Sequence, residues 1–405
     1  MSGWRLATSA EVAAVAEIAA SRRRLGIDTE FMSEGRYRAL LCLVQVVVED
    51  EDAPDGVRII LIDALEQVDV TPLRELLADP GVGIVLHAGR QDVAILRRTW
   101  DIELRNIFDT QIAAGFAGAS AQSGYANLLT QILGRRVGKS ASYTRWDARP
   151  LTAEQLSYAA EDVAHLLELA DELERRLKAS HRLEWAREEC RRLESATDER
   201  DPYTAWERLP RISQLDPRAR AVARELAAWR ETTAAQEDRP VGSVLADPTL
   251  VELAKRQPGD RAALEHIRGL HPSGIRRRGP AILAAIKQGR ESPPIPRERA
   301  RERFDSSDAP LISLTEALLR ARAAEAGLAY ELIASRAELE LIVGALRRSE
   351  PEPEVRTLEG WRAELVGDDL RALLGGRVAL RVGSDGRLEL TSGRPRARST
   401  SPESG

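Results

Sequence analysis

Three apolar runs, separated by short polar segments, stand close together near the start of the chain. They cover residues 24–31, 40–48 and 57–63, and the acidic stretch 49–56 lies between the second and the third. Apolar runs of this length, bounded by turn residues, predict β-strands, and the short acidic connection predicts a hairpin. The first part of the chain is therefore expected to build a sheet.

Helical patterns alternate with strand patterns around these runs. Residues 1–24 predict an amphipathic helix, and residues 71–80 predict a short helix with Thr71 as its N-cap and Pro72 at its first position. A further strand is expected at 83–89, followed by a helix over 91–100. Ser157–Lys178 has the pattern of the middle of one long amphipathic helix. The first part is therefore expected to be a mixed α/β domain over residues 1–200.

Strand signals end near residue 201, and helical periodicity takes over. We expect one helical domain over 201–290, with four or five short helices and with Asp247, Pro258 and Gly269 as helix stops. Residues 291–310 are rich in Pro and charge and predict a linker. A second helical domain is expected over 311–390, with helical pattern from Leu311 to Val382. The last residues, 391–405, have the composition of a disordered tail.

Composition excludes several classes of protein. With 43% hydrophobic and 30% charged residues in 405, the chain is an ordinary globular one, and it has no apolar run long enough to cross a membrane. We expect a cytoplasmic protein that does not bind membranes. Two distant cysteines and five scattered histidines give no zinc pattern, so any metal is expected to be held by carboxylates, which favours Mg²⁺ or Mn²⁺.

Five side chains on three predicted elements carry the candidate chemistry. Asp28 and Glu30 are two apart in a strand, so their carboxylates leave the same face, although such a pair by itself also fits an exposed strand edge. Asp92 begins a helix directly after a strand, where it could also simply compensate the helix dipole. Tyr158 and Asp162 are four apart and share a helix face.

If these four carboxylates lie together, their mutual repulsion is unfavourable unless cations fill the cluster. Two Mg²⁺ ions would activate a water and stabilise the leaving oxygen in phosphodiester hydrolysis. The chain has neither a Walker A sequence nor a GxGxxG segment after a strand, which argues against nucleotide-driven motors and dinucleotide oxidoreductases.

The segments around these residues closely resemble those of the bacterial ribonuclease D family, in the subgroup of DEDD 3′–5′ exonucleases whose third motif carries a tyrosine. The likeness lies in Asp28–Phe31 with Arg36, Tyr37 and Leu43–Gln45, in His87–Asp92, in Phe108–Gln111, in Lys139–Ser140 with Trp146–Leu151, and in Tyr158–Asp162. Ala141, Tyr143 and Arg145 depart from the residues common in relatives. All four metal-binding carboxylates and the tyrosine are retained.

The resemblance implies an RNase H-like (DnaQ-like) α/β exonuclease domain with a mixed sheet and a mechanism with two divalent cations, Mg or Mn. Asp28, Glu30 and Asp162 would hold the metal beside the attacking water, with Asp28 bridging to a second metal that Asp92 completes. Tyr158 would orient the water.

The helical half is similar to HRDC domains, in a first copy over 201–290 and a second, divergent copy over 311–390. The likeness rests on Ala227–Arg230, Val244–Asp247, Ala284–Ile286 and, in the second copy, Gly360–Leu365. HRDC domains are usually nucleic-acid-binding modules, and residues 201–300 carry 18 basic against 13 acidic side chains. The candidate phosphate contacts are Arg276, Arg277, Arg278, Lys255, Arg256 and Lys287, which could equally form a solvated charged face. Trp229 and Trp361 lie within helical apolar patterns and are expected in the core.

The function expected from these features is a 3′–5′ exoribonuclease that trims RNA with a free 3′ end, such as tRNA precursors, and releases nucleoside 5′-monophosphates. The same residues would serve a DNA 3′–5′ exonuclease. A third interpretation, a non-catalytic RNA-binding scaffold, conflicts with the intact set of acidic residues.

Overall fold

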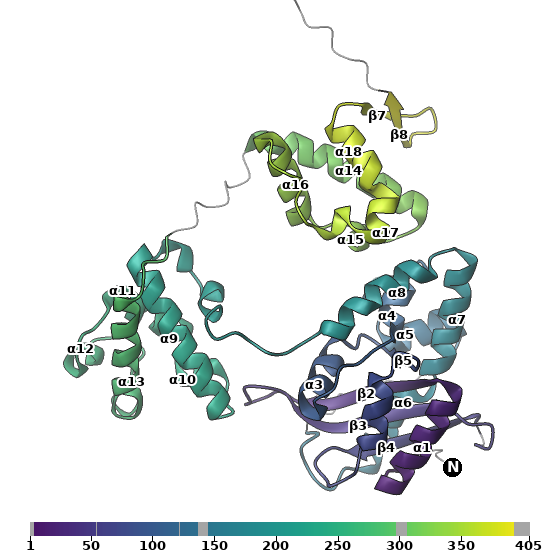
Figure 1. The fold of residues 1–405 in the computed structure, drawn as a ribbon, viewed down its shortest axis with the longest axis horizontal. Helices are drawn as coiled ribbons and strands as arrows, with labels where there is room; N and C mark the ends of the chain where they lie inside the picture. Colours follow the sequence, from purple (N-terminus) through teal and green to yellow (C-terminus); the bar gives the residue numbers. More distant parts are fainter. Residues whose placement is uncertain (1–3, 54, 121, 137–144, 297–305, 393–405) are drawn as a thin grey trace, which may run out of the picture.

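The computed structural model describes residues 4–53, 55–120, 122–136, 145–296 and 306–392. Along the chain it forms an α/β unit (residues 4–195), a first helical unit (205–291) and a second helical unit (306–392), which Figure 1 shows in purple to teal, green and yellow. The residues expected to form the linker core, 297–305, and most of the expected tail, 393–405, lie outside the described residues.

The α/β unit is built on one mixed six-stranded sheet with strand order β1-β4-β3-β2-β5-β6. Strands β2 and β3 pair antiparallel, as do β3 and β4, whereas β1 with β4, β2 with β5 and β5 with β6 are parallel pairs. The strands are β1 (Trp4–Leu6), β2 (Arg24–Met32), β3 (Leu40–Glu49), β4 (Val57–Asp63), β5 (Gly83–Leu86) and β6 (Ile107–Asp109). This confirms the expected strands and the expected hairpin through the acidic connection.

Side-chain alternation along the central strands divides the core between the two sheet faces. Val44, Val46 and Val48 of β3 pack on the face covered by α1 (Ser9–Arg22), α2 (Thr71–Ala78) and α3 (Arg90–Trp100). Leu43 and Val47 pack on the opposite face. That face is covered by α4 (Thr110–Phe116), α6 (Ala153–Ala164), α7 (Leu166–Ala179) and α8 (Leu183–Arg191), with α5 (Tyr125–Leu128), η1 (Leu129–Leu133) and η2 (Arg192–Ser195) alongside.

Two helix starts differ from their prediction. The expected N-terminal helix is preceded by the short edge strand β1, and α1 begins only at Ser9, after a capping box formed by Thr8 and Glu11. Thr71 is the first residue of α2, and the N-cap is Val70, so the predicted cap was wrong by one residue. Asp69 accepts a hydrogen bond from the Thr71 backbone N–H (2.9 Å), so the side-chain acceptor lies two residues earlier than expected.

The predicted long helix over Ser157–Lys178 is broken into α6 and α7 at His165. The His165 backbone N–H donates to the hydroxyl of Tyr125 at 3.1 Å. A backbone donor that is bonded to a side chain outside the helix does not continue the helical ladder. The break therefore depends on a residue 40 positions away, which the local pattern does not contain.

The first helical unit packs two long helices, α9 (Pro217–Gln236) and α13 (Pro272–Glu291), against each other. A Cβ atom at Gly289 would lie 2.5 Å from the Val222 Cα, so this position of α13 needs glycine for close approach. Trp229 packs against the core, as expected. The remaining elements are η3 (Ala205–Arg208), η4 (Ile212–Gln214), α10 (Val241–Val244), α11 (Asp247–Arg256) and α12 (Arg261–Glu265).

Asp247, which was expected to stop a helix, instead begins α11. It lies in the first turn with Pro248 beside it, a position that suits both an acidic side chain and a residue without a backbone N–H. The prediction confused a start signal with a stop signal.

The second helical unit combines two longer helices, of 18 and 13 residues, with several short ones, and it ends in a hairpin that was not predicted. The pattern up to Val382 was read as helical, but Val378–Val382 forms β7 and pairs antiparallel with β8 (Leu388–Ser392). The connection turns at Gly386, whose φ is +77°. The helical elements are η5 (Ser306–Asp308), α14 (Ala309–Ala326), α15 (Tyr330–Ile333), α16 (Arg336–Arg348), η6 (Arg356–Leu358), α17 (Gly360–Arg362), η7 (Ala363–Gly367) and α18 (Asp368–Leu374).

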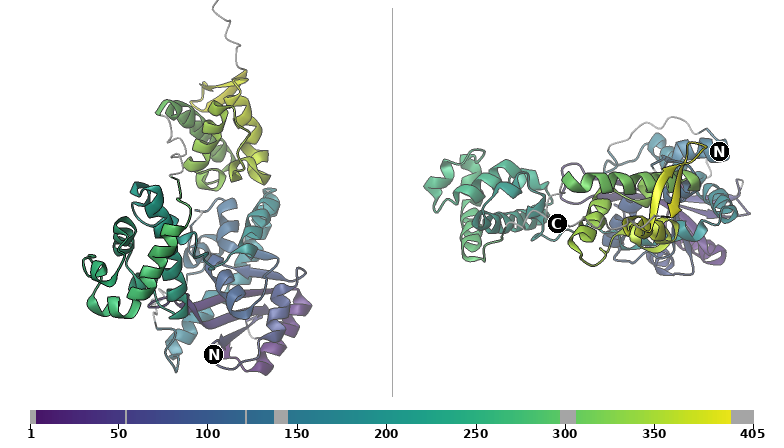
Figure 2. Two further views of the ribbon diagram at one scale, coloured as in Figure 1. Left: turned by 60° about the vertical axis from the view of Figure 1, so that its left-hand side comes forward. Right: turned by 90° about the horizontal axis from the view of Figure 1, so that it is seen from above.

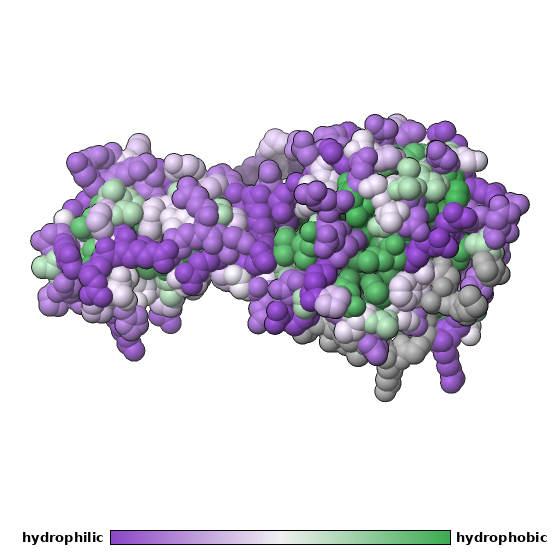
Figure 3. Space-filling view, turned by 90° about the horizontal axis from the view of Figure 1, so that it is seen from below, coloured by the Kyte–Doolittle hydropathy of each residue, from purple (hydrophilic) through white to green (hydrophobic). Residues whose placement is uncertain are grey.

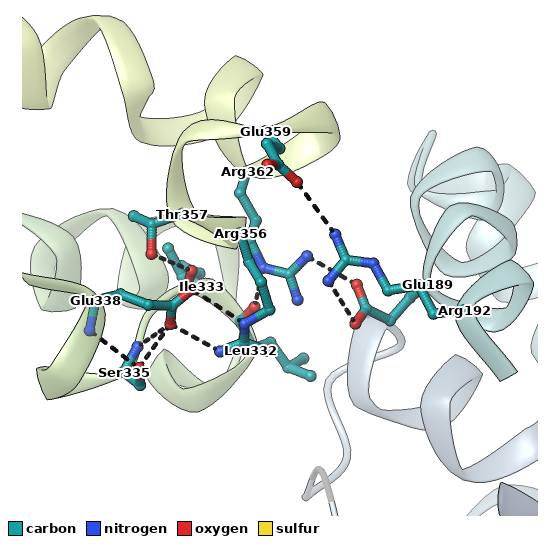
Figure 4. Close-up of polar contacts among 10 residues, drawn as sticks. All are labelled: Glu189, Arg192, Leu332, Ile333, Ser335, Glu338, Arg356, Thr357, Glu359 and Arg362. Atoms are coloured by element: carbon teal, nitrogen blue, oxygen red, sulfur yellow. Dashed lines mark hydrogen bonds and ion pairs between the residues drawn. The ribbon is translucent and has the colours of Figure 1, made fainter. Parts of the chain in front are cut away.

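The second helical unit is fastened to α8 of the α/β unit by a buried aromatic and charged contact. Trp361 is fully buried, stacks on Trp185 with ring centroids 5.4 Å apart and meets Phe116 edge-on at 4.9 Å. The neighbouring Arg362 is also fully buried and pairs with Glu189 at 2.8 Å, as Figure 4 shows. Trp361 therefore belongs to the core, as expected, but to a core shared between two units.

The first helical unit lies beside the connection between β2 and β3 (Figure 2), and hydrogen bonds join the two. Seen from below, its surface is largely hydrophilic, whereas apolar surface gathers on the α/β unit (Figure 3). Within the ranges that the structure describes, no helix is both long and apolar enough to span a bilayer.

Candidate active site

Strand β2 presents Asp28 and Glu30 near the middle of the sheet, between β3 and β5. The alternate residues Leu25 and Ile27 are fully buried on the opposite face, which fixes the direction of the two carboxylates. Asp28 keeps some exposed surface but is enclosed by protein atoms on most sides, and Glu30 is half-buried. Both acids lie in β2, two residues apart, so they leave the same face, and the charge of Glu30 adds to the raised pKa of Asp28.

Helix α3 brings Asp92 to the same place from the end of β5. The turn between them is held by Asp109, whose carboxylate accepts the backbone N–H groups of Ala88 (3.2 Å) and Gly89 (2.8 Å). Asp92 is 7% exposed, and its carboxylate accepts a hydrogen bond from the Thr29 hydroxyl. Thr29 lies between Asp28 and Glu30, so this bond ties α3 directly to the acidic segment of β2.

Helix α6 supplies Tyr158 and Asp162 from the other side. It begins at a capping box formed by Thr152 and Gln155, and its small residues Ala159 and Ala160 are buried against the sheet. The Tyr158 hydroxyl hydrogen-bonds the Asp162 carboxylate, which confirms that the two side chains share a face.

The pKa of each of the four carboxylates is raised. Burial is the main cause for each, and it raises the pKa of Glu30 to about 8, with added repulsion from Asp162 and Asp92. Burial also raises the pKa of Asp92 to about 6 and that of Asp162 to about 6, although hydrogen bonds from Thr29 and Tyr158 oppose the rise. The pKa of Asp28 lies well above its usual range because burial is joined by the charges of Asp92, Asp162 and Glu30. The group is thus a concentrated negative site that favours either protons or cations.

The donor set fits hard divalent cations, which prefer carboxylate and amide oxygens. Gln45 of β3 lies directly opposite Asp28 in the strand register, is fully buried, and neither polar atom of its amide has a partner in the described chain. A buried amide without hydrogen-bond partners beside an acidic cluster indicates a place for a polar group from outside the chain, such as a water or a hydrated cation. As they stand, no three His, Cys, Asp or Glu side chains of the described residues are gathered tightly enough to hold a metal ion.

Because protonation relieves this cluster, we expect the cation-free protein to lose stability as pH rises. Between the ordinary carboxyl values of 3.8–4.5 and about 8, the folded state binds more protons than the unfolded chain does. The melting temperature in EDTA should therefore fall as pH rises from about 4 to about 8. The fall should be less steep with saturating Mg²⁺, and also less steep in the Asp28→Asn variant. Thermal unfolding followed by circular dichroism tests this, and a melting temperature in EDTA that stays level or rises would contradict the charge assignment.

Three further side chains near the site have no role assigned from the sequence. Thr29 and Gln45 stand within the motif segments named above, and strand pairing places one between the two acids and the other opposite Asp28. Tyr125 has no local signal. Its hydroxyl is buried near Asp162 and Asp28, and burial together with these charges raises its pKa.

Arg149 fastens the segment before α6 to the sheet. Its guanidinium binds the buried Asp63 carboxylate at 2.5 and 2.6 Å and donates to the backbone carbonyls of Cys42 (3.0 Å) and Trp146 (2.8 Å). The Trp146 ring in turn lies 6.1 Å from that of Tyr158. The other quoted residues of this region, Lys139, Ser140, Ala141 and Tyr143, lie outside the described residues.

Arg149→Met should lower the free energy of unfolding by about 3 kcal/mol, because it leaves the Asp63 carboxylate buried without its partner. The exposed Arg145→Met, four residues earlier in the chain, is the matched control and should change stability by less than about 1 kcal/mol. Urea unfolding measures both. Equal, small losses would show that the Arg149 contacts contribute little.

The six predicted phosphate contacts are not equally available. Arg276 and Lys255 are exposed and form no ion pair with the described residues, whereas Lys287 and Arg256 pair within their helices with Glu291 and Glu252. Arg277 and Arg278 both bind Glu237, at 2.9 and 2.8 Å, and the Arg278 side chain is only 12% exposed.

Comparison with known proteins agrees with this fold and site. Residues 6–178 match a family described as 3′-5′ exonuclease, and residues 219–286 match the HRDC domain. Ribonuclease D of Gluconacetobacter diazotrophicus is 36% identical over 383 residues, which cover 93% of this chain and 94% of that protein. Ribonuclease D of Granulibacter bethesdensis is 37% identical, with 89% of each chain covered.

The crystal structure of Escherichia coli RNase D, described as an exoribonuclease involved in structured RNA processing, superposes with a TM-score of 0.79. It shares 29% sequence identity, and the likeness covers 91% of this chain and 98% of that one. The fold and the acidic site define a 3′–5′ exonuclease of the divalent-metal-dependent DEDD class with an HRDC domain. Within that class, the chain belongs to the ribonuclease D family and is an exoribonuclease of RNA processing.

Proposed function

We propose that this chain removes nucleotides one at a time from the free 3′ end of RNA, using two divalent cations, Mg or Mn, and releases nucleoside 5′-monophosphates. Precursors of tRNA are the substrates we infer for it. The observation that carries the proposal is the meeting of Asp28, Glu30, Asp92 and Asp162 from three elements, with each pKa raised.

We infer the roles of the site residues from the resemblance to the ribonuclease D family. Asp28, Glu30 and Asp162 would hold one cation, and Asp28 with Asp92 would hold the other. When bound, the two ions supply an activated water and stabilise the charge on the leaving oxygen. Asp28, which interacts electrostatically with all three other carboxylates, is the residue suited to bridge.

Tyr158 is assigned the orientation of the attacking water. Burial and the charges of Asp162 and Glu30 raise the pKa of its phenol, so the hydroxyl remains protonated at neutral pH. A protonated hydroxyl can hold a water by hydrogen bonding but does not act as a base.

The two helical units are proposed to be HRDC-type modules with the boundaries 201–290 and 311–390, joined by a linker over 291–310; the second is the divergent copy. The first would bind RNA phosphates through Arg276, Lys255, Lys287 and Arg256. We assign Arg277 and Arg278 a smaller part because both already bind Glu237.

Replacing Arg276, Lys255 and Lys287 together by glutamine should weaken RNA binding and reduce its salt dependence. For single strands the slope of log affinity against log salt should become shallower by about 2, because each lost phosphate contact contributes about 0.7. Fluorescence anisotropy of labelled RNA over a KCl series measures the slope. An unchanged slope would mean that Arg276, Lys255 and Lys287 do not contact RNA phosphates.

The choice between RNA and DNA is tested by hydrolysis of matched oligonucleotides that differ only in the 2′-hydroxyl. We expect faster shortening of the RNA. Faster shortening of DNA would identify a DNA exonuclease, and binding without any shortening over a Mg²⁺ and Mn²⁺ series would identify a scaffold.

A further inference from the structure

The connection between β2 and β3 (residues 33–39) joins the α/β unit to helix α9 and the residue just beyond its end. The Tyr37 hydroxyl donates to Glu231 at 2.9 Å, and Glu231 is 4% exposed. Arg36 pairs with Asp238 at 2.7 Å, and the Tyr37 backbone N–H donates to the same carboxylate at 3.2 Å. These contacts join the first helical unit to the connection that follows β2, the strand that carries Asp28 and Glu30.

Two hollows lie on either side of this junction. One, of about 400 Å³, is lined by the 36–40 segment, Arg98, Ala235 and Asp238. The other, of about 170 Å³, is lined by residues of both the chain between the units and α9, including Arg200, Arg208 and Glu231. Arginine is the most frequent residue type around both hollows.

Three carboxylates near the junction bind other side chains, and a fourth, Asp201, lines the smaller hollow and accepts the Tyr203 backbone N–H at 2.9 Å. Asp238 binds Arg36, Glu231 binds Tyr37, and Asp198 binds Arg98 at 2.9 Å. Arg38 and Arg200, in contrast, have no ion-pair partner in the described parts of the chain. Each guanidinium lies 5.9 Å from the centre of the Tyr37 ring. Two cationic groups are thus held around one aromatic ring and left without an anion.

The junction is close to the acidic site. Arg98, which lines the larger hollow, lies six residues beyond Asp92 on α3, about 9 Å along the helix axis. The charge of Arg36 also reaches Asp147, which follows the Trp146 that packs near Tyr158. An RNA strand with its 3′ end at the carboxylates would therefore have a backbone phosphate within reach of the junction after one or two nucleotides.

We propose that Arg38 and Arg200, placed around Tyr37 at the junction, form a subsite for a backbone phosphate of single-stranded RNA on the 5′ side of the scissile bond. Guanidinium groups suit phosphate because they present several donors in a planar fork. Because one arginine comes from the β2–β3 connection and the other from the chain leading to α9, a bound phosphate would also fasten the first helical unit to the α/β unit. This inference rests on the proposed RNA substrate.

The test uses the full-length double variant Arg38→Gln/Arg200→Gln. Neither side chain has an ionic partner to lose within the described residues, so the melting temperature should stay near that of the wild type. The matched control is Arg175→Gln/Arg387→Gln, which removes two exposed arginines from α7 and from the β7–β8 connection. Each protein is assayed for binding in EDTA to a single-stranded RNA of about ten nucleotides, and for kcat/KM on that RNA and on a dinucleotide.

The double variant should bind the longer RNA about tenfold more weakly, and its salt slope should be shallower by about 0.7, for one lost phosphate contact. Its kcat/KM should fall by a similar factor on the longer RNA only, because a dinucleotide has no phosphate on the 5′ side of its scissile bond. An affinity of the double variant within about twofold of the wild type would overturn the subsite. Equal losses of kcat/KM on both substrates would also overturn it, as would the same loss of affinity in the control variant. The binding measurement in EDTA does not depend on cleavage. If the wild type cuts neither RNA, the proposed function is contradicted, but the binding data still test the phosphate subsite.

Discussion

Asp28→Asn should lower kcat on RNA by roughly 1,000-fold or more while changing RNA affinity little. The substitution removes one negative charge from the carboxylate that interacts with all three other acids, and so weakens both cation sites at once. A loss of this size corresponds to about 4 kcal/mol of transition-state stabilisation. The phosphate-binding arginines are untouched, so anisotropy with labelled RNA should give nearly the wild-type dissociation constant.

The matched control is Glu161→Gln on the same helix as Asp162. Glu161 is exposed, although its charge contributes a little to the raised pKa of Asp162. It should retain kcat within about threefold, since a single exposed charge is largely screened by solvent. Comparable losses in the two variants would mean that general negative charge, and not a bridging carboxylate, is what the reaction needs.

Trp361→Ala should be the most destabilising single substitution outside the acidic site, by about 3–5 kcal/mol. Its ring is fully buried between Trp185 and Phe116 of the α/β unit, and the neighbouring Arg362 pairs with Glu189 (Figure 4). Truncation opens a cavity at the contact between the two units and leaves Trp185 partly unpacked. The second helical unit should therefore melt or separate at a lower temperature than the rest.

Differential scanning calorimetry separates these transitions, and Trp361→Phe, which keeps an aromatic ring, should lose less than half as much stability. Cleavage of a dinucleotide at 25 °C should survive in Trp361→Ala, because no site residue belongs to that contact. A melting profile shifted by less than about 1 °C would show that the two units are not stabilised by this contact.

Strands and site residues could be predicted where the deciding pattern lies within a few neighbouring residues of the sequence. Asp28 and Glu30 follow an apolar strand start, and Tyr158 and Asp162 share a helix face, so spacing alone grouped them in pairs. Spacing could not show that the pairs meet Asp92. That grouping came from the family resemblance, and the structure supports it through the raised pKa values.

The features that were missed depend on contacts between distant segments. The break at His165 needs the Tyr125 hydroxyl. Trp361 was expected in a core, but its packing on Trp185 of α8 in the α/β unit was not foreseen. The junction around Tyr37 needs Glu231, which is 194 residues away. The β7–β8 hairpin is different, because its alternating pattern and its Asp-Gly turn were present in the sequence and were read as the end of a helical domain.

The central claim is that four carboxylates and Tyr158 form a metal-dependent site that shortens RNA from its 3′ end. It is tested most directly by a time course on a 5′-labelled RNA with a single-stranded 3′ end, for wild type and Asp28→Asn, with Mg²⁺, with Mn²⁺ and with EDTA. We predict a ladder that shortens one nucleotide at a time from the 3′ end in the wild type with either ion, and no ladder in EDTA or in Asp28→Asn. A ladder of equal intensity in Asp28→Asn, or one that persists in EDTA, would contradict the account.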